Sequence, residues 1–203
     1  MSTLTEIMIK HGSDKGGGHH NYTEYYEKLL GHLRNDKINL LEIGIGTMNP
    51  NIPSSMAGTP GGYTPGSSLR GWKEYFPNGR IYGCDIDKEI LFFDNRIQTF
   101  FLDQTSPKSI DEAICKVDRT YDIIVDDGLH DFNVNCKVMK QIFHKLNDDG
   151  YYIIEDILPY LYNPEHIFTE GIEWKYIRIP NEKNNFDNNI LVARKKGKFI
   201  PDY

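Results

Sequence analysis

The sequence is poor in cysteine. Its three cysteines, Cys84, Cys115 and Cys136, lie far apart and form no CxxC pair. This spacing offers no disulfide framework, and no cluster of Cys and His residues indicates a zinc site. We therefore expect reduced thiols that mostly fill the core, and a cytoplasmic location.

Long apolar runs and an excess of basic residues are also absent. No run reaches the roughly 18–20 apolar residues that a membrane-spanning helix needs. The first residues, MSTLTEIMIKHG, lack the charged-then-apolar order of a signal peptide. The formal net charge of −6 argues against nucleic acid as the main partner, because phosphate binding requires a basic face. We expect neither a membrane nor a nucleic-acid partner.

From residue 38 onward, apolar runs typical of buried strands alternate with helical patterns. The strand-like runs are INLLEIG, RIYGCDID, RIQTFFLDQ, YDIIVDD and GYYIIED, followed by EWKYIRI and NILVARKK, which are close enough to pair antiparallel. Helical patterns separate most of them: SSLRGWKEYF, SPKSIDEAICKV and NVNCKVMKQIFHKL. This alternation predicts an α/β fold with a parallel sheet flanked by helices. The length of 203 residues predicts a single domain, residues 1–203, with its core in residues 36–203.

Two further helices are predicted before this core, in residues 1–35. Ser2–Lys10 has Ser2 or Thr3 as its cap and Gly12 as its stop, and Tyr22–Leu33 carries an apolar stripe. The loop between them, GSDKGGGHHNY, is polar and rich in glycine. A second loop, Thr47–Ser67, is rich in proline and glycine and leads to a helix that Ser67 or Ser68 would cap.

Polar residues gather where the predicted strands end. In chain order these residues are Glu42 and Gly44, Asp85, Asp103 and Gln104, Asp126 and Asp127, and Glu155 and Asp156. Ligands of such sheets bind at the carboxyl ends of the strands, so the five ends would meet at one edge. A solvent-exposed strand end is the alternative for any single carboxylate. Two carboxylate pairs at adjacent strand ends favour a built site.

The first of these strand ends suits a nucleoside without phosphates. The glycines of LEIGIG let a ligand approach the backbone, although a plain tight turn would use the same glycines. Asp85 can accept both hydroxyls of a ribose, with a solvated strand end as the alternative. The glycines run into a proline-rich stretch instead of a helix start, and Glu42 would repel a pyrophosphate.

The later strand ends offer oxygen ligands for a hard divalent cation. Asp127, Glu155 and Asp156 suit Mg²⁺, with Mn²⁺ and Ca²⁺ as alternatives. Because side chains alternate along a strand, Asp126 and Asp127 should not both face the ion, and parity alone does not decide between them. His130 follows three residues after Asp127 and is a candidate general base. Simple packing at a helix start is its other interpretation.

These segments together resemble a known enzyme family. GSDKGGGHHNYTEYYEKLL, LLEIGIG, SLRGWKEYFPNGRIYGCDID, RIQTFFLDQTS, YDIIVDDGLH and GYYIIEDI are similar to class I S-adenosylmethionine-dependent methyltransferases. More closely, they resemble the metal-dependent sugar O-methyltransferases of macrolide biosynthesis, of the mycinamicin and tylosin type. The resemblance spans roughly residues 9 to 160. It implies a Rossmann-like, mostly parallel seven-stranded sheet with helices on both faces and an antiparallel last strand.

The resemblance also implies roles for individual residues. The cofactor contacts that it implies are Glu42, Gly44, Gly46, Ser68, Asp85, Asp103, Gln104, Asp126, Tyr22 and Lys15. Of these, Asp103 and Gln104 would lie near the adenine of the cofactor. It assigns the metal to Asp127, Glu155 and Asp156, and proton removal to His130. The Ser13-Asp14-Lys15 loop, with His20 and Tyr22, would close over the cofactor or acceptor, so that residues 1–35 form a helical lid.

The function expected from these observations is O-methylation of a hydroxyl on a sugar or sugar-bearing small molecule, free or nucleotide-linked. S-adenosylmethionine would be the methyl donor and Mg²⁺ the metal. The alternatives are a catechol-like O-methyltransferase, a nicotinamide-dependent oxidoreductase and a non-catalytic cofactor-binding module. No predicted helix begins directly after the glycines to bind a pyrophosphate, which disfavours the oxidoreductase. The complete set of carboxylates with His130 disfavours the non-catalytic module.

The chain departs from the macrolide enzymes in two regions. Those enzymes carry a large extra N-terminal portion, whereas some 35 residues precede the first strand here. The loop Thr47–Ser67 is also long. Both regions would touch the acceptor or subunit contacts, so the identity of the sugar and the assembly state, a homo-oligomer included, stay open.

Overall fold

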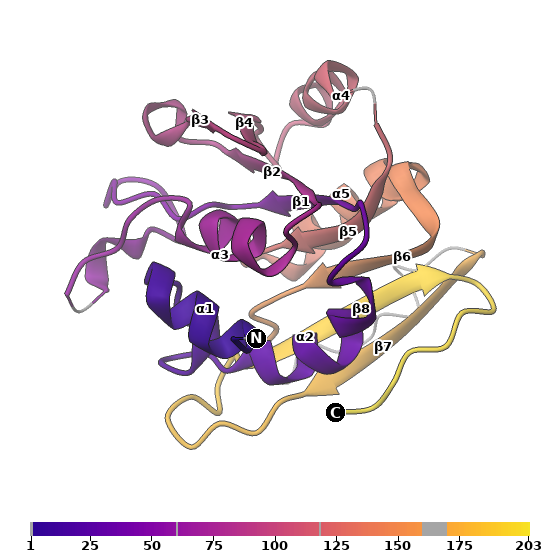
Figure 1. The fold of residues 1–203 in the computed structure, drawn as a ribbon. Helices are drawn as coiled ribbons and strands as arrows, with labels where there is room; N and C mark the ends of the chain where they lie inside the picture. The colour runs from indigo at the N-terminus through magenta and orange to yellow at the C-terminus, as the bar shows by residue number, and fades with distance from the viewer. Residues whose placement is uncertain (1, 60, 118, 160–169) are drawn as a thin grey trace.

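The computed structural model describes residues 2–59, 61–117, 119–159 and 170–203. One sheet of eight strands, in the order β3-β4-β2-β1-β5-β6-β8-β7, runs through the molecule (Figure 1). The strands are β1 (Asn39–Ile43), β2 (Arg80–Asp85), β3 (Phe93–Asp94), β4 (Ile97–Phe101), β5 (Tyr121–Asp126), β6 (Leu146–Ile154), β7 (Ile172–Arg178) and β8 (Asn189–Lys195). The predicted Rossmann-like α/β fold is confirmed.

The sheet is mostly parallel, as predicted, with a reversed last strand. Strands β4, β2, β1, β5 and β6 run parallel, and β8 lies between β6 and β7, antiparallel to both. The sheet has one strand more than predicted, because β3 pairs antiparallel with the outer side of β4. A strand of two residues is too short to show a hydrophobic period, so no sequence pattern indicated it.

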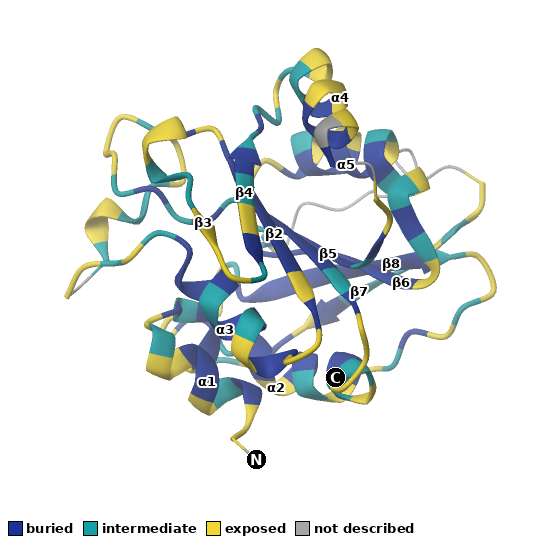
Figure 2. Ribbon diagram, turned by 45° about the horizontal axis from the view of Figure 1, so that its top comes forward, coloured by how far each residue is buried: buried dark blue, intermediate teal, exposed yellow. Residues whose placement is uncertain are grey.

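Helices cover both faces of the sheet (Figure 1). They are α1 (Leu4–His11), α2 (Tyr22–Leu30), α3 (Ser67–Tyr75), α4 (Pro107–Lys116) and α5 (Phe132–Ile142). The first three share one hydrophobic cluster with the sheet, and the last two share the other. Leu40 and Leu41, neighbours in β1, contribute to opposite clusters because successive side chains of a strand point to opposite faces. The central strands β1 and β5 accordingly have no exposed residue, and most of the sheet is buried (Figure 2).

The helix ends agree with the sequence in part. Helix α1 begins after Thr3, which forms a capping box with Glu6, and ends at Gly12 with a φ of +77°. Helix α2 ends earlier than predicted, at Leu30, and a 3₁₀ turn follows it. The cap of α3 is Gly66, so the predicted serine cap is wrong. Gly66 has a φ of +75°, and a Cβ there would lie 2.5 Å from the ring of Phe92.

The N-terminal segment packs as part of the core. Met8, Tyr22, Tyr25 and Tyr26 are fully buried in the cluster that covers one face of the sheet. The Glu27 carboxylate accepts hydrogen bonds from the Leu4 backbone and the Tyr75 hydroxyl, at 2.8 and 2.9 Å, and so links α1, α2 and α3. The role of residues 1–35 as a lid stays a prediction.

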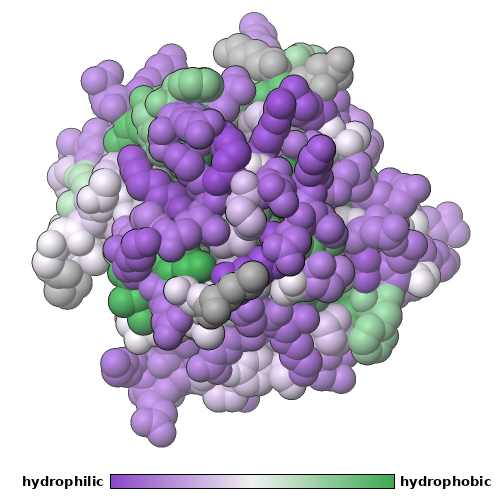
Figure 3. Space-filling view, in the orientation of Figure 1, coloured by the Kyte–Doolittle hydropathy of each residue, from purple (hydrophilic) through white to green (hydrophobic). Residues whose placement is uncertain are grey.

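One face of the molecule is mainly polar (Figure 3). The face seen in Figure 3 is mostly hydrophilic, with a few separate apolar groups. Within the described ranges, the structure contains no helix with the length and hydrophobicity needed to cross a bilayer.

Candidate active site

The ends of three adjacent strands, β1, β5 and β6, bring the predicted carboxylates together. Asp126 pairs with Ile43 on one side and Ile154 on the other. The backbone bonds continue past the strands, from the Asp127 N–H to the Ile43 carbonyl at 2.8 Å and from the Glu155 N–H to the Asp126 carbonyl at 3.0 Å. Asp127 and Glu155 therefore leave the sheet side by side with fixed backbones.

Asp126 and Asp127 point in different directions, as the alternation along a strand predicts. The Asp126 side chain is fully buried, where it accepts hydrogen bonds from Gln104 Nε2 at 2.7 Å and the Tyr152 hydroxyl at 3.3 Å. Burial raises the pKa of Asp126 to about 6. Only Asp127 joins the acidic cluster at the sheet edge, so a cofactor contact by Asp126 stays a prediction.

Lys15 lies at the centre of this cluster. Its side chain is only 2% exposed, and its Nζ donates to Asp127 Oδ2 and Glu155 Oε2 and lies 3.6 Å from Glu42 Oε1. Burial by itself would lower the pKa of Lys15, but the three negative charges raise it well above its usual value. Tyr26 donates to the other oxygen of Glu155. The cluster thus already accommodates one cation.

Glu42 forms the inner wall of the same cluster. It is buried in β1 and accepts a hydrogen bond from Trp72 Nε1 at 2.9 Å. Burial raises the pKa of Glu42 to about 7, and the facing charge of Lys15 opposes that rise. Ser68, in the first turn of α3, is buried beside it. Three predicted cofactor contacts, Glu42, Ser68 and Lys15, therefore meet in space.

His130 and Asp156 form the outer part of the site. The Nε2 atom of His130 lies 3.2 Å from Asp156 Oδ2 and 3.3 Å from Asp127 Oδ1. Tyr22 donates its hydroxyl hydrogen to Asp156 Oδ1, and His20 Nδ1 lies 3.5 Å from the same oxygen. One donor atom each from Asp127, His130 and Asp156 lies within 4.8 Å of the other two. This spacing brings an imidazole and two carboxylates into reach of one ligand.

Two side chains from other loops hold the turn before His130. Gln104 accepts the Leu129 N–H at 2.8 Å while it donates to Asp126, and Ser54 Oγ donates to the Leu129 carbonyl at 2.9 Å. At Gly128 a Cβ would lie 1.9 Å from Gln104 Oε1, so a side chain there would displace the Gln104 amide. Gln104, expected near an adenine, thus also braces the turn that carries His130.

The glycine turn after β1 packs closely against two other segments of the chain. Gly44 has a φ of +85°, and a Cβ there would lie 2.1 Å from the Asp127 carbonyl oxygen. Gly46 has a φ of +82°, and the ring of Tyr63 would lie 2.3 Å from its Cβ. Tyr63 therefore brings the long loop 47–67 onto the predicted cofactor turn.

The remaining predicted contacts shape turns at their strand ends. Asp85 accepts the N–H groups of Ile45 and Asp87, both at 2.9 Å, and burial raises its pKa. Asp103 accepts the N–H and the hydroxyl of Thr105, at 2.9 and 2.7 Å. Their contacts with a cofactor stay predictions.

Comparison with known proteins identifies the relatives of this chain. No protein-family model matches it. A rhamnosyl tetracenomycin-C 2′-O-methyltransferase of Streptomyces olivaceus is 33% identical over 154 residues, 76% of the chain and 37% of the relative. The mycinamicin VI 2″-O-methyltransferase of Micromonospora griseorubida is 32% identical over 161 residues, 76% of the chain and 36% of the relative. The chain is a homologue of these sugar O-methyltransferases.

Solved structures agree with this homology. A methyltransferase of the mycinamycin biosynthetic pathway, in complex with Mg and SAH, is 29% identical and superposes with a TM-score of 0.63 over 76% of the chain and 37% of that structure. A form that also contains mycinamycin VI covers 98% of the chain and 57% of that structure, with a TM-score of 0.71. At 23% identity this second likeness shows the fold alone. The present chain spans little more than a third of the length of these curated relatives.

The acidic cluster at the sheet edge of this chain fits a hard divalent cation. Asp127, Glu155 and Asp156 offer oxygen donors, and the Lys15 ammonium between two of them shows that the cluster accommodates positive charge. The Nε2 atom of His130 lies close to one oxygen of Asp127 and to one oxygen of Asp156. Glu155 is engaged by Lys15 and Tyr26, so it can join the ligand set only when Lys15 moves.

Several residues of the site were missed by sequence reasoning. Tyr26 had a signal, since it follows Tyr22 by four residues and shares its helix face. Trp72 lies on the buried face of α3 and resembles any core aromatic residue. Ser54 and Tyr63 come from an irregular loop, which has no period that could predict where its side chains point.

Proposed function

We propose that this chain carries the catalytic core of an S-adenosylmethionine-dependent, divalent-metal-dependent O-methyltransferase that acts on a hydroxyl of a sugar or sugar-bearing small molecule. The observation that carries this proposal is the meeting of Asp127, His130 and Asp156, whose donor atoms lie within 4.8 Å of one another. A base beside a cation-binding carboxylate pair suits the removal of a proton from a hydroxyl. The names of the relatives support the acceptor class.

The cofactor would bind at the glycine turn after β1. S-adenosylmethionine supplies the methyl group, carried on a positively charged sulfur. Gly44 and Gly46 give this turn its left-handed backbone, and the acidic edge of the sheet attracts the positive charge of the cofactor. Glu42, Ser68 and Lys15 line the inner side, and Asp85 accepts ribose hydroxyls. The other assigned contacts are Tyr22, Asp103, Gln104 and Asp126.

The divalent cation would be held by Asp127, Glu155 and Asp156. Mg²⁺, when bound, supplies the Lewis acidity that makes a hydroxyl easier to deprotonate. Tyr22 donates a hydrogen bond to one oxygen of Asp156, and Tyr26 donates one to an oxygen of Glu155. Each bond fixes the direction of the other oxygen of that carboxylate. Such outer hydrogen bonds orient metal ligands.

His130 is assigned to proton removal. Its Nε2 lies between the two carboxylates, and 35% of its side chain is exposed, which leaves a path for the proton to reach solvent. The hydrogen bond to Asp127 and the charge of Asp156 outweigh burial and raise its pKa to about 9. The imidazole is therefore protonated at neutral pH until positive charge at the carboxylates offsets this effect, and only the neutral imidazole can accept a proton.

A methyl-transfer assay tests the proposal. The purified chain would be incubated with isotopically labelled S-adenosylmethionine, Mg²⁺ and separate panels of free sugars, nucleotide-linked sugars, glycosylated macrolides and catechols. We expect transfer to a sugar hydroxyl that disappears in EDTA and returns with Mg²⁺, while calorimetry shows cofactor binding in both conditions. Asp127→Asn should reproduce the loss. Turnover of catechols alone would assign the alternative acceptor class, and full turnover in EDTA would remove the metal from the reaction.

The same preparation tests the cofactor. Binding of the sulfonium compound or its demethylated product, with poor binding of NAD, is the expected result. Tight NAD binding without a response to the sulfonium compound would refute the methyltransferase assignment.

A further inference from the structure

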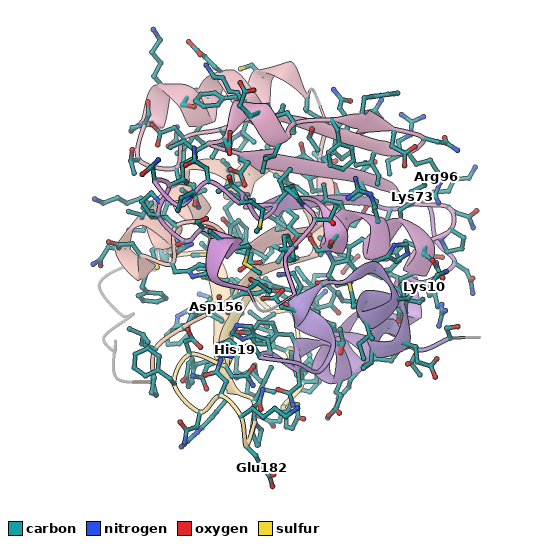
Figure 4. All side chains as sticks on the ribbon, turned by 90° about the vertical axis from the view of Figure 1, so that its left-hand side faces the viewer. Lys10, His19, Lys73, Arg96, Asp156 and Glu182 are labelled. Carbon is teal, nitrogen blue, oxygen red and sulfur yellow. The ribbon has the colours of Figure 1, made fainter. Side chains whose placement is uncertain are left out.

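A second group of metal-binding side chains lies next to the carboxylate cluster. His19 and His20 precede α2, and Asp187 precedes β8, yet one donor atom from each lies within 4.8 Å of the other two. His20 Nδ1 lies 3.5 Å from Asp156 Oδ1, so the group adjoins the candidate active site. Figure 4 shows the labelled His19 close to Asp156.

Hydrogen bonds hold the two loops of this group together. Asn181 Nδ2 donates to the His19 carbonyl at 2.9 Å, and Asn188 Nδ2 donates to Asn21 Oδ1 at 2.7 Å. Asn21 Nδ2 in turn donates to the Pro180 carbonyl at 3.1 Å. The donors are therefore positioned before any ion arrives, which lowers the conformational cost of binding.

His20 is buried, and one of its ring nitrogens faces the Asp156 carboxylate at 3.5 Å without a hydrogen bond. The residue is only 5% exposed, and its Nδ1 atom makes no hydrogen bond to any part of the chain that the structure describes. Its ring is stacked on Tyr22 with the centroids 4.9 Å apart, which limits its rotation. A metal-bound imidazole commonly has a carboxylate beside its other ring nitrogen, and Asp156 lies in that position beside Nδ1 of His20.

Asp187 is oriented for the same role. Asn184 Nδ2 donates to its Oδ1 at 2.7 Å, which leaves the second oxygen to face a ligand. The Tyr22 hydroxyl also contacts the Asp187 carbonyl, at 3.3 Å. A carboxylate steadied by an outer hydrogen bond is typical of metal ligands.

We propose that His19, His20 and Asp187 form a second metal site, for a divalent transition ion such as Zn²⁺. Two imidazoles and one carboxylate are the donors that Zn²⁺ prefers, whereas Mg²⁺ prefers oxygen alone. Because His19 is exposed, solvent or a small ligand can complete the coordination. The bound ion joins the N-terminal segment to the loop before β8, and Tyr22, which contacts both Asp187 and Asp156, connects it to the candidate active site.

Zinc titration of the intact chain in saturating Mg²⁺ tests this site without a measurement of activity. Calorimetry should show one equivalent of Zn²⁺ bound while Mg²⁺ occupies the oxygen-only site, and thermal unfolding should shift upward. His19→Ala and Asp187→Asn should each weaken Zn²⁺ binding by roughly 10–100-fold, since even the loss of an outer partner has an effect of that order. His144→Ala, which removes an exposed histidine elsewhere, should leave binding unchanged.

Two results would overturn the site. One is Zn²⁺ affinity of His19→Ala and Asp187→Asn equal to that of the wild type. The other is Zn²⁺ binding that Asp127→Asn abolishes and His19→Ala does not, which would place the ion in the carboxylate cluster. The absorption spectrum of the Co²⁺-loaded chain provides a second readout, because His19→Ala should change its ligand-field bands.

Discussion

His130 and Asp156 face each other across the carboxyl edge of the sheet, with 3.2 Å between Nε2 and Oδ2, and both have a left-handed backbone, with φ of +56° and +54°. This conformation is uncommon for residues other than glycine and is maintained only where the surrounding structure holds it. The Leu129 bonds to Gln104 and Ser54 provide that support on the His130 side. Two such residues in contact indicate a pair that the fold positions for a purpose.

The first prediction concerns the base. His130→Asn should lower kcat by about 10²–10⁴-fold, the usual contribution of a positioned proton acceptor. Asparagine tolerates the left-handed backbone of this position but cannot accept the proton. Steady-state kinetics would measure kcat, and calorimetry should show unchanged cofactor affinity. A folded His130→Asn protein with normal kcat would refute the base assignment and leave the metal and cofactor assignments untouched.

The second prediction is a pH dependence of stability. The pKa of His130 is about 9 in the folded metal-free protein, above its usual value of roughly 6.5. The folded state therefore binds the proton more tightly, and this contribution to stability is complete below pH of about 6.5 and is lost as pH rises through about 9. In EDTA, the Tm difference between the wild type and His130→Asn should shrink across that window. NMR titration of the imidazole should show the pKa fall when Mg²⁺ is added, and an unchanged pKa would argue against an ion beside it.

The third prediction concerns Lys15. Lys15→Met leaves Asp127 and Glu155 without their buried cation, and removing one partner of a buried ion pair costs about 3–5 kcal/mol. The Tm in EDTA should therefore fall, and Mg²⁺ should restore much of it, because a cation returns to the carboxylates. Calorimetry should show tighter Mg²⁺ binding than in the wild type.

Lys10→Met is the matched control for this substitution. Lys10 pairs with Glu74 at the surface, with 63% of its side chain exposed, and such pairs contribute little. Its Tm and Mg²⁺ affinity should stay near the wild-type values. Weaker Mg²⁺ binding in Lys15→Met would show that the lysine supports the ion instead of competing with it.

The fourth prediction separates two roles of Gln104. As the brace of the turn before His130, Gln104→Ala should lower kcat by about 10–100-fold, because small displacements of a reacting group slow the reaction strongly. If this brace is the only role of Gln104, cofactor affinity should change little. A higher cofactor Kd with normal kcat would instead support the adenine contact. Gln98→Ala, at an exposed position of β4, is the control and should change neither quantity.

Much of the fold follows from patterns that are local in the chain. The runs INLLEIG and YDIIVDD predicted buried parallel strands because both faces of the sheet are covered, and the structure confirms β1 and β5. The polar residue at each strand end could also be read directly, since parallel strands place their carboxyl ends at one edge. The alternation along β5 separated Asp126 from Asp127 without showing which one faces the site.

The sequence by itself determined which chemical groups stand at the sheet edge: carboxylates, glycines and a histidine at the ends of predictable strands. Only the tertiary structure decided how they pair. Lys15 reaches Glu155, and His19 and His20 reach Asp187, across most of the chain. Such contacts depend on the paths of irregular loops. The apolar residues of a loop follow no regular spacing, so the sequence shows no periodicity that could predict where its side chains point. Strand periodicity records which face is buried, whereas the partner of a buried charge is set by the long-range packing that brings distant loops together.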